Sequence, residues 1–345
     1  MSIVVLKLPE VKSTASRPKR CPACKHEALQ RWGGQVKPVR DPQIKAAQVY
    51  RYRCCRCGHT FRHYPAGLSQ AQQSERLRRL AGLGWVLGLS FRGIAGLFAA
   101  FGVVLSRMTA WRDQQAWAEQ LTRRQMQKPV RVLGLDGAYV RGCGAVQPVL
   151  VAVDLGTGQP VAVGYVDEKD PQAVQRWLAP VVQQLGVSVI VTDDLLTYRS
   201  VARQLDLEHQ VCQFHVRRWV GRALHDLRLS LAPDWHWVLD EIKTLLAELP
   251  IQGSRRLVDL YRLIPARFSH TSAQSPLERL RLLLIRLSEC WPSYRLFDWQ
   301  PEVPWTNNCT EQVIGRMKMR SHSVRGYKSA PTMLAGLIAA GAWVY

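Results

Sequence analysis

The spacing of hydrophobic positions predicts helices in the stretch from residue 70 to residue 125. Apolar side chains recur there at the spacing of a helix face, at Leu77, Leu80, Leu83, Trp85, Val86 and Leu89. This periodicity and the turn residues between the runs predict three helices, over residues 74–87, 91–98 and 105–115. Ser74 is the expected N-cap of the first helix. Residues 125–130 are expected to form a linker.

Beyond residue 130 the pattern becomes that of β-strands. Three short β-rich runs, separated by turn residues, predict an antiparallel meander over residues 131–136, 147–154 and 160–166. An amphipathic helix over 171–185 and a wholly apolar strand over 187–191 follow, and such a strand is typical of a buried parallel sheet. From about Asp194 to Glu289 the chain is expected to be mainly helical. Residues 309–345 are predicted to form a helix, a basic loop and a final apolar helix.

The composition is that of a soluble globular protein, with 47% hydrophobic and 21% charged residues. No stretch approaches the ~18 uninterrupted apolar residues of a transmembrane helix. The N-terminus lacks the apolar run and small-residue cleavage site of a signal peptide. We therefore expect a cytoplasmic, nucleoid-associated protein with no membrane partner.

Positive charge is concentrated in the first part of the chain. The formal net charge is +21, and residues 1–130 carry 23 basic and 6 acidic side chains. Residues 131–345 are nearly balanced, with 24 basic and 20 acidic side chains. A basic module joined to a balanced one favours a polyanion as the partner, and double-stranded DNA is the obvious candidate.

Four of the nine cysteines form two CxxC pairs, Cys21 with Cys24 and Cys54 with Cys57. In a chain without an export signal this spacing predicts metal binding rather than disulfides. Four thiolates suit tetrahedral Zn²⁺, which would be structural because no open position is indicated. Cys55 could replace Cys54, although Gly58 after the pair favours Cys54.

The three predicted helices have the form of a helix-turn-helix, with the turn at residues 101–103. The third helix would then face the major groove of DNA. The side chains expected to do so are Ser106, Arg107, Thr109 and Arg112.

Two aspartates are expected to end neighbouring strands, and a glutamate follows later. Asp136 ends the first strand run, and Asp193 follows the buried strand. A meander, a helix and a parallel strand occur in this order in ribonuclease-H-like folds, where the first and fourth strands are neighbours. A helix beginning near Asn308 would direct Glu311 towards the sheet. Carboxylates placed in this way suit two Mg²⁺ or Mn²⁺ ions.

One position of register stays open, because Asp193 and Asp194 are adjacent and only one can point into the site. Asp193 is preferred since it directly follows the apolar strand. Asp154 also ends a strand, but that strand runs antiparallel to the first. Asp154 is therefore excluded.

The chain resembles insertion-sequence DDE transposases, with a catalytic domain similar to that of Mutator-like elements. The resemblance covers most of residues 131–345. It depends on GLDG at Asp136, VTDD at Asp193, CQFH at 212–215, NNCTEQVIGRMKMR around Glu311 and the later RGYKS. It implies that Asp136, Asp193 and Glu311 bind the catalytic metals. Cys212, His215 and Asp194 would then surround the active site. Cations suited to DNA phosphates follow Glu311, at Arg316, Lys318, Arg320, Arg325 and Lys328.

The resemblance implies an enzyme that cuts and rejoins DNA at the ends of a mobile element, as a homodimer or larger assembly. No small-molecule organic cofactor is expected. The predicted domains are a tail and zinc ribbon (1–68), a helix-turn-helix (69–125), a ribonuclease-H-like core (131–215 and 301–345) and a helical insertion (216–300). Two other functions stay open, a non-catalytic or domesticated DNA-binding regulator and a ribonuclease-H-like nuclease.

Overall fold

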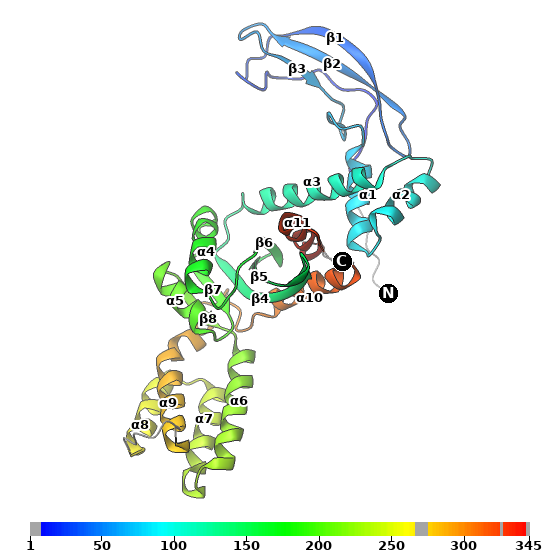
Figure 1. The fold of residues 1–345 in the computed structure, drawn as a ribbon. Coiled ribbons are helices and arrows are strands. Elements are labelled where there is room, and N and C mark those ends of the chain that lie inside the picture. Colours follow the sequence, from blue (N-terminus) through cyan, green and yellow to red (C-terminus); the bar gives the residue numbers. More distant parts are fainter. Residues whose placement is uncertain (1–7, 266–274, 325–326, 343–345) are drawn as a thin grey trace. The chain divides into compact units, whose positions relative to one another are not determined.

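The structure is a computed structural model that describes residues 8–265, 275–324 and 327–342. The chain divides into two compact units, whose elements are labelled in Figure 1. The first unit contains residues 1–123, 142–144 and 317–345, and the second contains residues 124–141 and 145–316. The predicted catalytic acids all lie in the second unit.

The first unit begins with an antiparallel sheet of three strands. The strands follow each other in the order of the chain, as β1 (Leu29–Pro38), β2 (Ala46–Cys54) and β3 (Thr60–His63). The paired cysteines lie at one end of this sheet, where Leu29 pairs with Cys54. The small core at that end includes Cys21, Leu29, Tyr52 and Cys54, which leaves little apolar surface to stabilise the sheet.

Three helices follow the sheet, α1 (Glu75–Val86), α2 (Phe91–Ala100) and α3 (Arg107–Gln125). The predicted N-cap is confirmed, because Ser74 Oγ accepts a hydrogen bond from the backbone N of Leu77 at 3.1 Å. The predicted turn before α3 contains Gly102, which has a left-handed φ of 70°. The prediction for α3 was too short: residues 116–125 are good helix formers and carry it on to Gln125.

The predicted final apolar helix is confirmed as α11 (Ala330–Gly341), which packs against α1 in the first unit. Gly336 allows this approach, since a Cβ there would lie 3.1 Å from the Trp85 ring. Among the described residues, no helix is long and apolar enough to cross a membrane.

The second unit contains a mixed sheet of five strands. Their order across the sheet is β6 (Gln159–Gly164), β5 (Ala145–Asp154), β4 (Val132–Gly142), β7 (Val189–Thr192) and β8 (Glu208–Val211). The predicted meander is confirmed as β4, β5 and β6. The predicted fourth strand is β7, which pairs with β4 in parallel. Helix α4 (Pro171–Leu185) precedes it, also as predicted.

Two expectations about the strands were wrong. Strand β4 continues to Gly142, so Asp136 lies within it rather than at its end. Strand β8 falls in the stretch expected to be helical, and α5 (Leu196–Gln204) precedes it. Its sequence, EHQV, lacks the apolar pattern of a buried strand. Gln210 is nevertheless fully buried, because its side-chain oxygen accepts from the backbone N of Phe297 at 3.2 Å.

The sheet is covered on both faces by apolar side chains. Alternate residues of β4 point to opposite faces. Leu133 and Leu135 join a core with residues of α4 and α5, whereas Val132 joins Val189 and Val191 in a second cluster. Asp136 lies four residues after Val132 on the same strand, so it is on the same face of the sheet as the cluster of Val132, Val189 and Val191.

The rest of the second unit is helical, as predicted, apart from β8. Four helices form one core, α6 (Gln213–Ser230), α7 (His236–Glu248), α8 (Gly253–Leu263) and α9 (Pro276–Tyr294). Two 3-10 turns, Pro233–Trp235 and Leu296–Asp298, adjoin them. Helix α10 (Asn308–Ser323) begins where the sequence predicts.

In the first unit, a buried carboxylate connects the segment after β1 to α1. Asp41 is 1% exposed, and its Oδ1 lies 2.6 Å from Arg76 Nη2. The hydroxyl of Ser74 and the backbone N–H groups of Gln43 and Ile44 also donate to it. Burial alone would raise the pKa of Asp41, but the hydrogen bonds from Arg76 and Ser74 outweigh it and lower the pKa.

We expect Asp41→Asn to destabilise the first unit by about 3–5 kcal/mol, because it leaves Arg76 without its buried partner. Urea unfolding followed by circular dichroism measures the loss. Glu119→Gln is the matched control, since it removes the exposed Glu119–Arg123 pair on α3 and should cost less than ~0.5 kcal/mol. Equal losses for the two variants would contradict a structural role for the Asp41 network.

Candidate functional site

The pairing of β4 with β7 brings two aspartates together. Gly134 pairs with Val191 in the parallel register, and the same register continued by two residues places Asp136 opposite Asp193. Asp193 directly follows the last residue of β7, Thr192. Both carboxyl groups therefore lie at the carboxyl end of the β4–β7 pairing.

Burial and nearby negative charges raise the pKa values of both aspartates. The pKa of Asp136 rises to about 7, first through burial and then through the negative charges of Asp193 and Glu168. The pKa of Asp193 rises to about 6, first through burial and then through Glu168. The charge of His215 opposes both shifts. A cation at this position would relieve the repulsion.

Asp194 is held by residues of α9. The Arg286 Nη2 donates to Asp194 Oδ2 and to its backbone oxygen, each at 2.9 Å. The Tyr294 hydroxyl donates to the same carboxyl oxygen at 3.4 Å. Burial raises the pKa of Asp194, and Arg286 partly offsets the effect. Among the described hydrogen bonds, the carboxylate of the adjacent Asp193 accepts only the backbone N–H of Leu195, at 3.3 Å.

Glu311 lies in the first turn of α10, beside the start of α6. Its Oε1 is 2.8 Å from His215 Nε2. Cys212 is buried at the N-cap of α6, and its sulfur accepts the backbone N–H of Asn307 at 3.3 Å. The ligand atoms of Cys212, His215 and Glu311 all lie within 4.8 Å of one another.

The start of α10 packs closely on β4 in the second unit. The Asn307 side-chain N donates to the backbone oxygen of Leu135 at 2.8 Å. A Cβ at Gly134 would lie 2.7 Å from Asn307 Oδ1 and 2.1 Å from the Thr310 hydroxyl. Glycine at residue 134 therefore allows the helix that carries Glu311 to approach the strand that carries Asp136.

The structure does not place the three predicted metal ligands in one compact group. Among the described residues, Glu311 shares a 4.8 Å group with Cys212 and His215 but not with Asp136 and Asp193. His215 links the two sets, because it contacts Glu311 and its charge acts on both aspartates.

Sequence reasoning missed a fourth acid in this region, Glu168. Its Oε2 accepts a hydrogen bond from the buried Tyr198 hydroxyl at 3.0 Å. A Cβ at Gly137 would lie 2.0 Å from the same oxygen, so Glu168 lies over the glycine that follows Asp136. The only hint in the sequence is that glycine in GLDG, which marks a close approach but does not name the partner.

The four predicted zinc ligands form a second cluster, in the first unit. The sulfurs of Cys21, Cys24, Cys54 and Cys57 all lie within 4.8 Å of one another. Tetrahedral Zn²⁺ with Zn–S bonds of about 2.3 Å requires sulfurs about 3.8 Å apart. Cys21 and Cys57 are 3.8 Å apart, and Cys24 and Cys54 are 3.5 Å apart. The cluster is therefore consistent with structural zinc.

Each cysteine pair forms the same turn. The backbone N of Lys25 donates to Cys21 O, and that of Gly58 donates to Cys54 O, each at 3.0 Å. Lys25 and Gly58 both have a left-handed φ, 61° and 68°. The backbone N–H of Cys57 points at Cys54 and lowers the pKa of that thiol. Cys54 belongs to the cluster, whereas Cys55 is exposed and lies outside it.

The predicted DNA-contacting residues of α3 differ in their surroundings. Arg107 and Arg112 are exposed on the helix. Ser106 accepts from the backbone N of Thr109 at 3.1 Å, and the two hydroxyls are 2.9 Å apart. Ser106 and Thr109 thus stabilise the start of α3.

The predicted cations after Glu311 also differ in their exposure to solvent. Lys318 and Lys328 are exposed, and Arg316 is half-buried. Arg320 is buried within the first unit, 4.2 Å over the Trp85 ring, and donates to Leu89 O at 3.2 Å. This packing occupies the guanidinium that was expected to face DNA phosphates. Arg325 lies outside the described residues.

Comparisons with known proteins give the family. The model of the transposase IS66 family matches residues 156–329, slightly more than half of the chain. The match contains Asp193, Cys212, His215 and Glu311 and begins after Asp136. The chain is also similar to "Insertion element ISM1 uncharacterized 48.3 kDa protein" of Methanobrevibacter smithii, with 23% identity over 212 residues. That alignment covers 59% of this chain and 52% of the relative, so the chain spans about half of the relative's length. The chain belongs to the IS66 transposase family.

Proposed function

We propose that this chain is a DDE transposase with a ribonuclease-H-like core, which cuts and joins DNA at the ends of an insertion sequence. The order of the five strands supports that fold, because β4 and β7 are parallel neighbours. These are the first and fourth strands of this sheet along the chain. Family membership supports the reaction class. The observation that carries the proposal is the register that sets Asp136 opposite Asp193.

Asp136 and Asp193 are hard oxygen donors and suit Mg²⁺ or Mn²⁺. Two such ions, when bound, would neutralise the reacting phosphate and polarise the attacking oxygen. Glu311 supplies the third carboxylate. Its Oε1 contacts His215, which would orient it so that Oε2 turns towards the aspartates. Glu168 adds negative charge beside both aspartates.

The proposed reaction has two in-line displacements. In the first, a water oxygen attacks phosphorus at the element end, and the P–O3′ bond breaks to give a 3′-hydroxyl and a 5′-phosphate. In the second, that 3′-hydroxyl attacks a target phosphodiester. The new P–O3′ bond replaces the target's own, so no outside energy source or protein–DNA covalent bond is needed. The carboxylates would act as ionised metal ligands and form no bond to DNA themselves.

DNA recognition would belong to the basic N-terminal part and to cations near the catalytic acids. The zinc ribbon and the exposed Arg107 and Arg112 of α3 would contact the terminal inverted repeats. The exposed Lys318 and Lys328 are further candidates for phosphate contacts. Because two element ends must be joined, we propose a homodimer or larger assembly. The protein would act at the nucleoid.

We expect Asp136→Asn, Asp193→Asn and Glu311→Gln each to lower strand transfer by at least about 100-fold, because each removes a charged metal ligand. Gel analysis of labelled element ends with Mg²⁺ measures cleaved and joined products separately. DNA binding without added divalent metal should stay within about threefold of the unsubstituted protein.

Asp154→Asn is the matched control, since Asp154 ends β5 and accepts from the backbone N of Gly156 at 2.9 Å. It should retain full activity. Undiminished transfer by Asp136→Asn would contradict the proposed metal site. Cleaved products that are never joined, with every DNA end tested, would favour a nuclease instead.

We expect metal affinity to rise with pH through the range of about 6 to 7. In the metal-free protein the raised pKa values, about 7 for Asp136 and about 6 for Asp193, keep both carboxyls largely protonated at lower pH. The metal must then displace those protons. Calorimetry with Mn²⁺ should show at least ~10-fold tighter binding at about pH 8 than at about pH 5.

The same shifts set the sign of a stability effect. Because the pKa values of Asp136 and Asp193 are raised, their carboxyl groups contribute to the free energy of unfolding at low pH. That contribution is lost as pH rises through about 6 to 7. Bound Mn²⁺ should restore it, so the metal should raise Tm more at about pH 8 than at about pH 5. A metal response independent of pH, or one retained in Asp136→Asn/Asp193→Asn, would contradict the assignment.

We expect Cys54→Ser to lose the bound zinc and to unfold the three-stranded sheet of the first unit, whose apolar core is small. Cys55→Ser should keep about one zinc per chain, because Cys55 is exposed outside the cluster. Metal analysis of the purified variants, with limited proteolysis of residues 20–64, distinguishes them. Equal zinc content in the two variants would overturn the four-cysteine site.

A further inference from the structure

One face of α6 carries basic side chains at increasing distance along the helix from the candidate active site. His215, Arg218, Trp219 and Arg222 are separated by three, four and seven residues, so they share one side of the helix. Arg218 and Arg222 are exposed, whereas Trp219 is half-buried. The stripe begins at His215, whose ring contacts Glu311.

A cavity of about 490 Å³ lies against this stripe. Its lining residues come from the end of β7, α6 and α9, and they are Asp193, Asp194, Leu195, His215, Arg218, Trp219, Arg222 and Arg286. The cavity is thus lined by two acidic side chains and three arginines, and Arg286 is paired with Asp194. Asp193 is the carboxylate that faces Asp136 across the strand register.

The three arginines of the cavity differ in the contacts that their side chains make. Arg286 is already engaged, with Asp194 at 2.9 Å and with the Trp219 ring at 4.3 Å from its guanidinium carbon. The side chains of Arg218 and Arg222, which are exposed, make no hydrogen bond or ion pair with any residue that the structure describes. Two uncompensated cations beside a carboxylate site suit a ligand with several negative charges.

We propose that Arg218 and Arg222 bind phosphates of the DNA strand that enters the carboxylate site, next to the reacting phosphate. This assignment rests on the proposed function for the location of the reacting phosphate. The carboxylates would hold one phosphate through the metals that they bind, and the arginines would hold its neighbours along the same strand. These contacts would fix the position of the DNA strand in the site and its 5′-to-3′ direction.

The dimensions of the helix agree with this arrangement. At ~1.5 Å per residue, the stripe from His215 to Arg222 is about 10 Å long. One strand of B-DNA carries a charge every ~3.4 Å along its axis. Because the strand also winds around that axis, its phosphates are farther apart than this rise, and the stripe is long enough to face about two successive phosphates.

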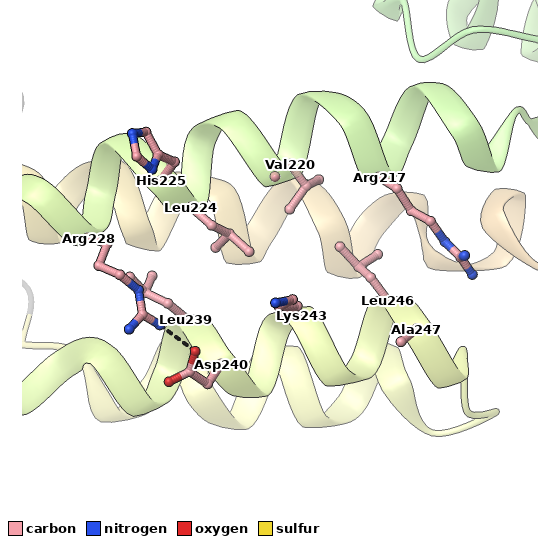
Figure 2. Close-up of a pocket in the computed structure, with 11 residues that line it drawn as sticks. Arg217, Val220, Leu224, His225, Arg228, Leu239, Asp240, Lys243, Leu246 and Ala247 are labelled. Atoms are coloured by element: carbon pink, nitrogen blue, oxygen red, sulfur yellow. Dashed lines mark hydrogen bonds and ion pairs between the residues drawn. The ribbon is translucent and has the colours of Figure 1, made fainter.

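A groove between α6 and α7 differs from this cavity in its lining. It has a volume of about 640 Å³ and a partly apolar lining that includes Val220, Leu224, Leu239 and Leu246. Figure 2 shows Arg217 and Arg228 at opposite ends of this groove, and Arg228 pairs with Asp240. The catalytic aspartates do not line it. Arg217 and its neighbour Arg218 are both exposed, but Arg217 lines the other groove, which makes it a matched control.

The test measures binding of fluorescein-labelled mixed-sequence duplex DNA by anisotropy, over a series of KCl concentrations and without added divalent metal. The variants of the full chain are Arg218→Gln/Arg222→Gln, Arg218→Lys/Arg222→Lys and the control Arg217→Gln. Each lost phosphate contact lowers the salt slope of log K by about 0.9, so the double glutamine variant should lose about 1.8. Its affinity should fall roughly 60-fold at ~0.1 M KCl.

The double lysine variant should keep a slope near that of the unsubstituted protein, because it retains both charges, and Arg217→Gln should change it little. An unchanged slope in the double glutamine variant overturns the proposal. A loss of about 0.9 in Arg217→Gln also overturns it, since DNA would then follow the charge of α6 as a whole. Because no metal is added, failure of the proposed catalysis is separate: Asp136→Asn could remain active while the arginine variant still loses its DNA contacts.

Discussion

The parallel register of β4 and β7, continued by two residues, sets Asp136 opposite Asp193, and both are half-buried. Two carboxylates brought together in this way repel each other, and burial removes much of the water that would screen them. The apolar side chains on both faces of the sheet hold the register in spite of this repulsion. The strained charge arrangement is thus maintained by packing, and a bound cation would relieve it.

Two glycines of β4 allow other elements to reach this pair. Gly134 leaves space for Thr310 and Asn307, which bring the first turn of α10 onto the strand. Gly137 leaves space for the carboxylate of Glu168. The chain therefore gathers acids from four separate segments around one strand, and the small residues of that strand determine how closely they approach.

Helix α6 connects the carboxylate site to the helical part of the second unit. It starts directly after β8, with Cys212 at its N-cap and His215 in its first turn. Farther along, its buried residues join the core shared with α7, α8 and α9. Arg286 of α9 forms an ion pair with Asp194, so the helical part contacts one of the two adjacent aspartates directly.

Local patterns in the sequence were sufficient for the cysteine cluster, the N-cap of α1, the meander, α4 and the start of α10, because each depends on near neighbours or on simple periodicity. They were insufficient for β8, where polar letters conceal a buried strand whose Gln210 finds its partner at Phe297.

The partners of the predicted site residues also came only from the tertiary structure. Glu168 approaches Gly137, Glu311 contacts His215, and Arg320 packs on Trp85 instead of remaining open to DNA. Each of these contacts joins segments far apart in the chain, and periodicity carries no information about such distant pairs. The sequence by itself determined which residue types were present for metal and DNA chemistry. The packing of distant segments decided which of them meet.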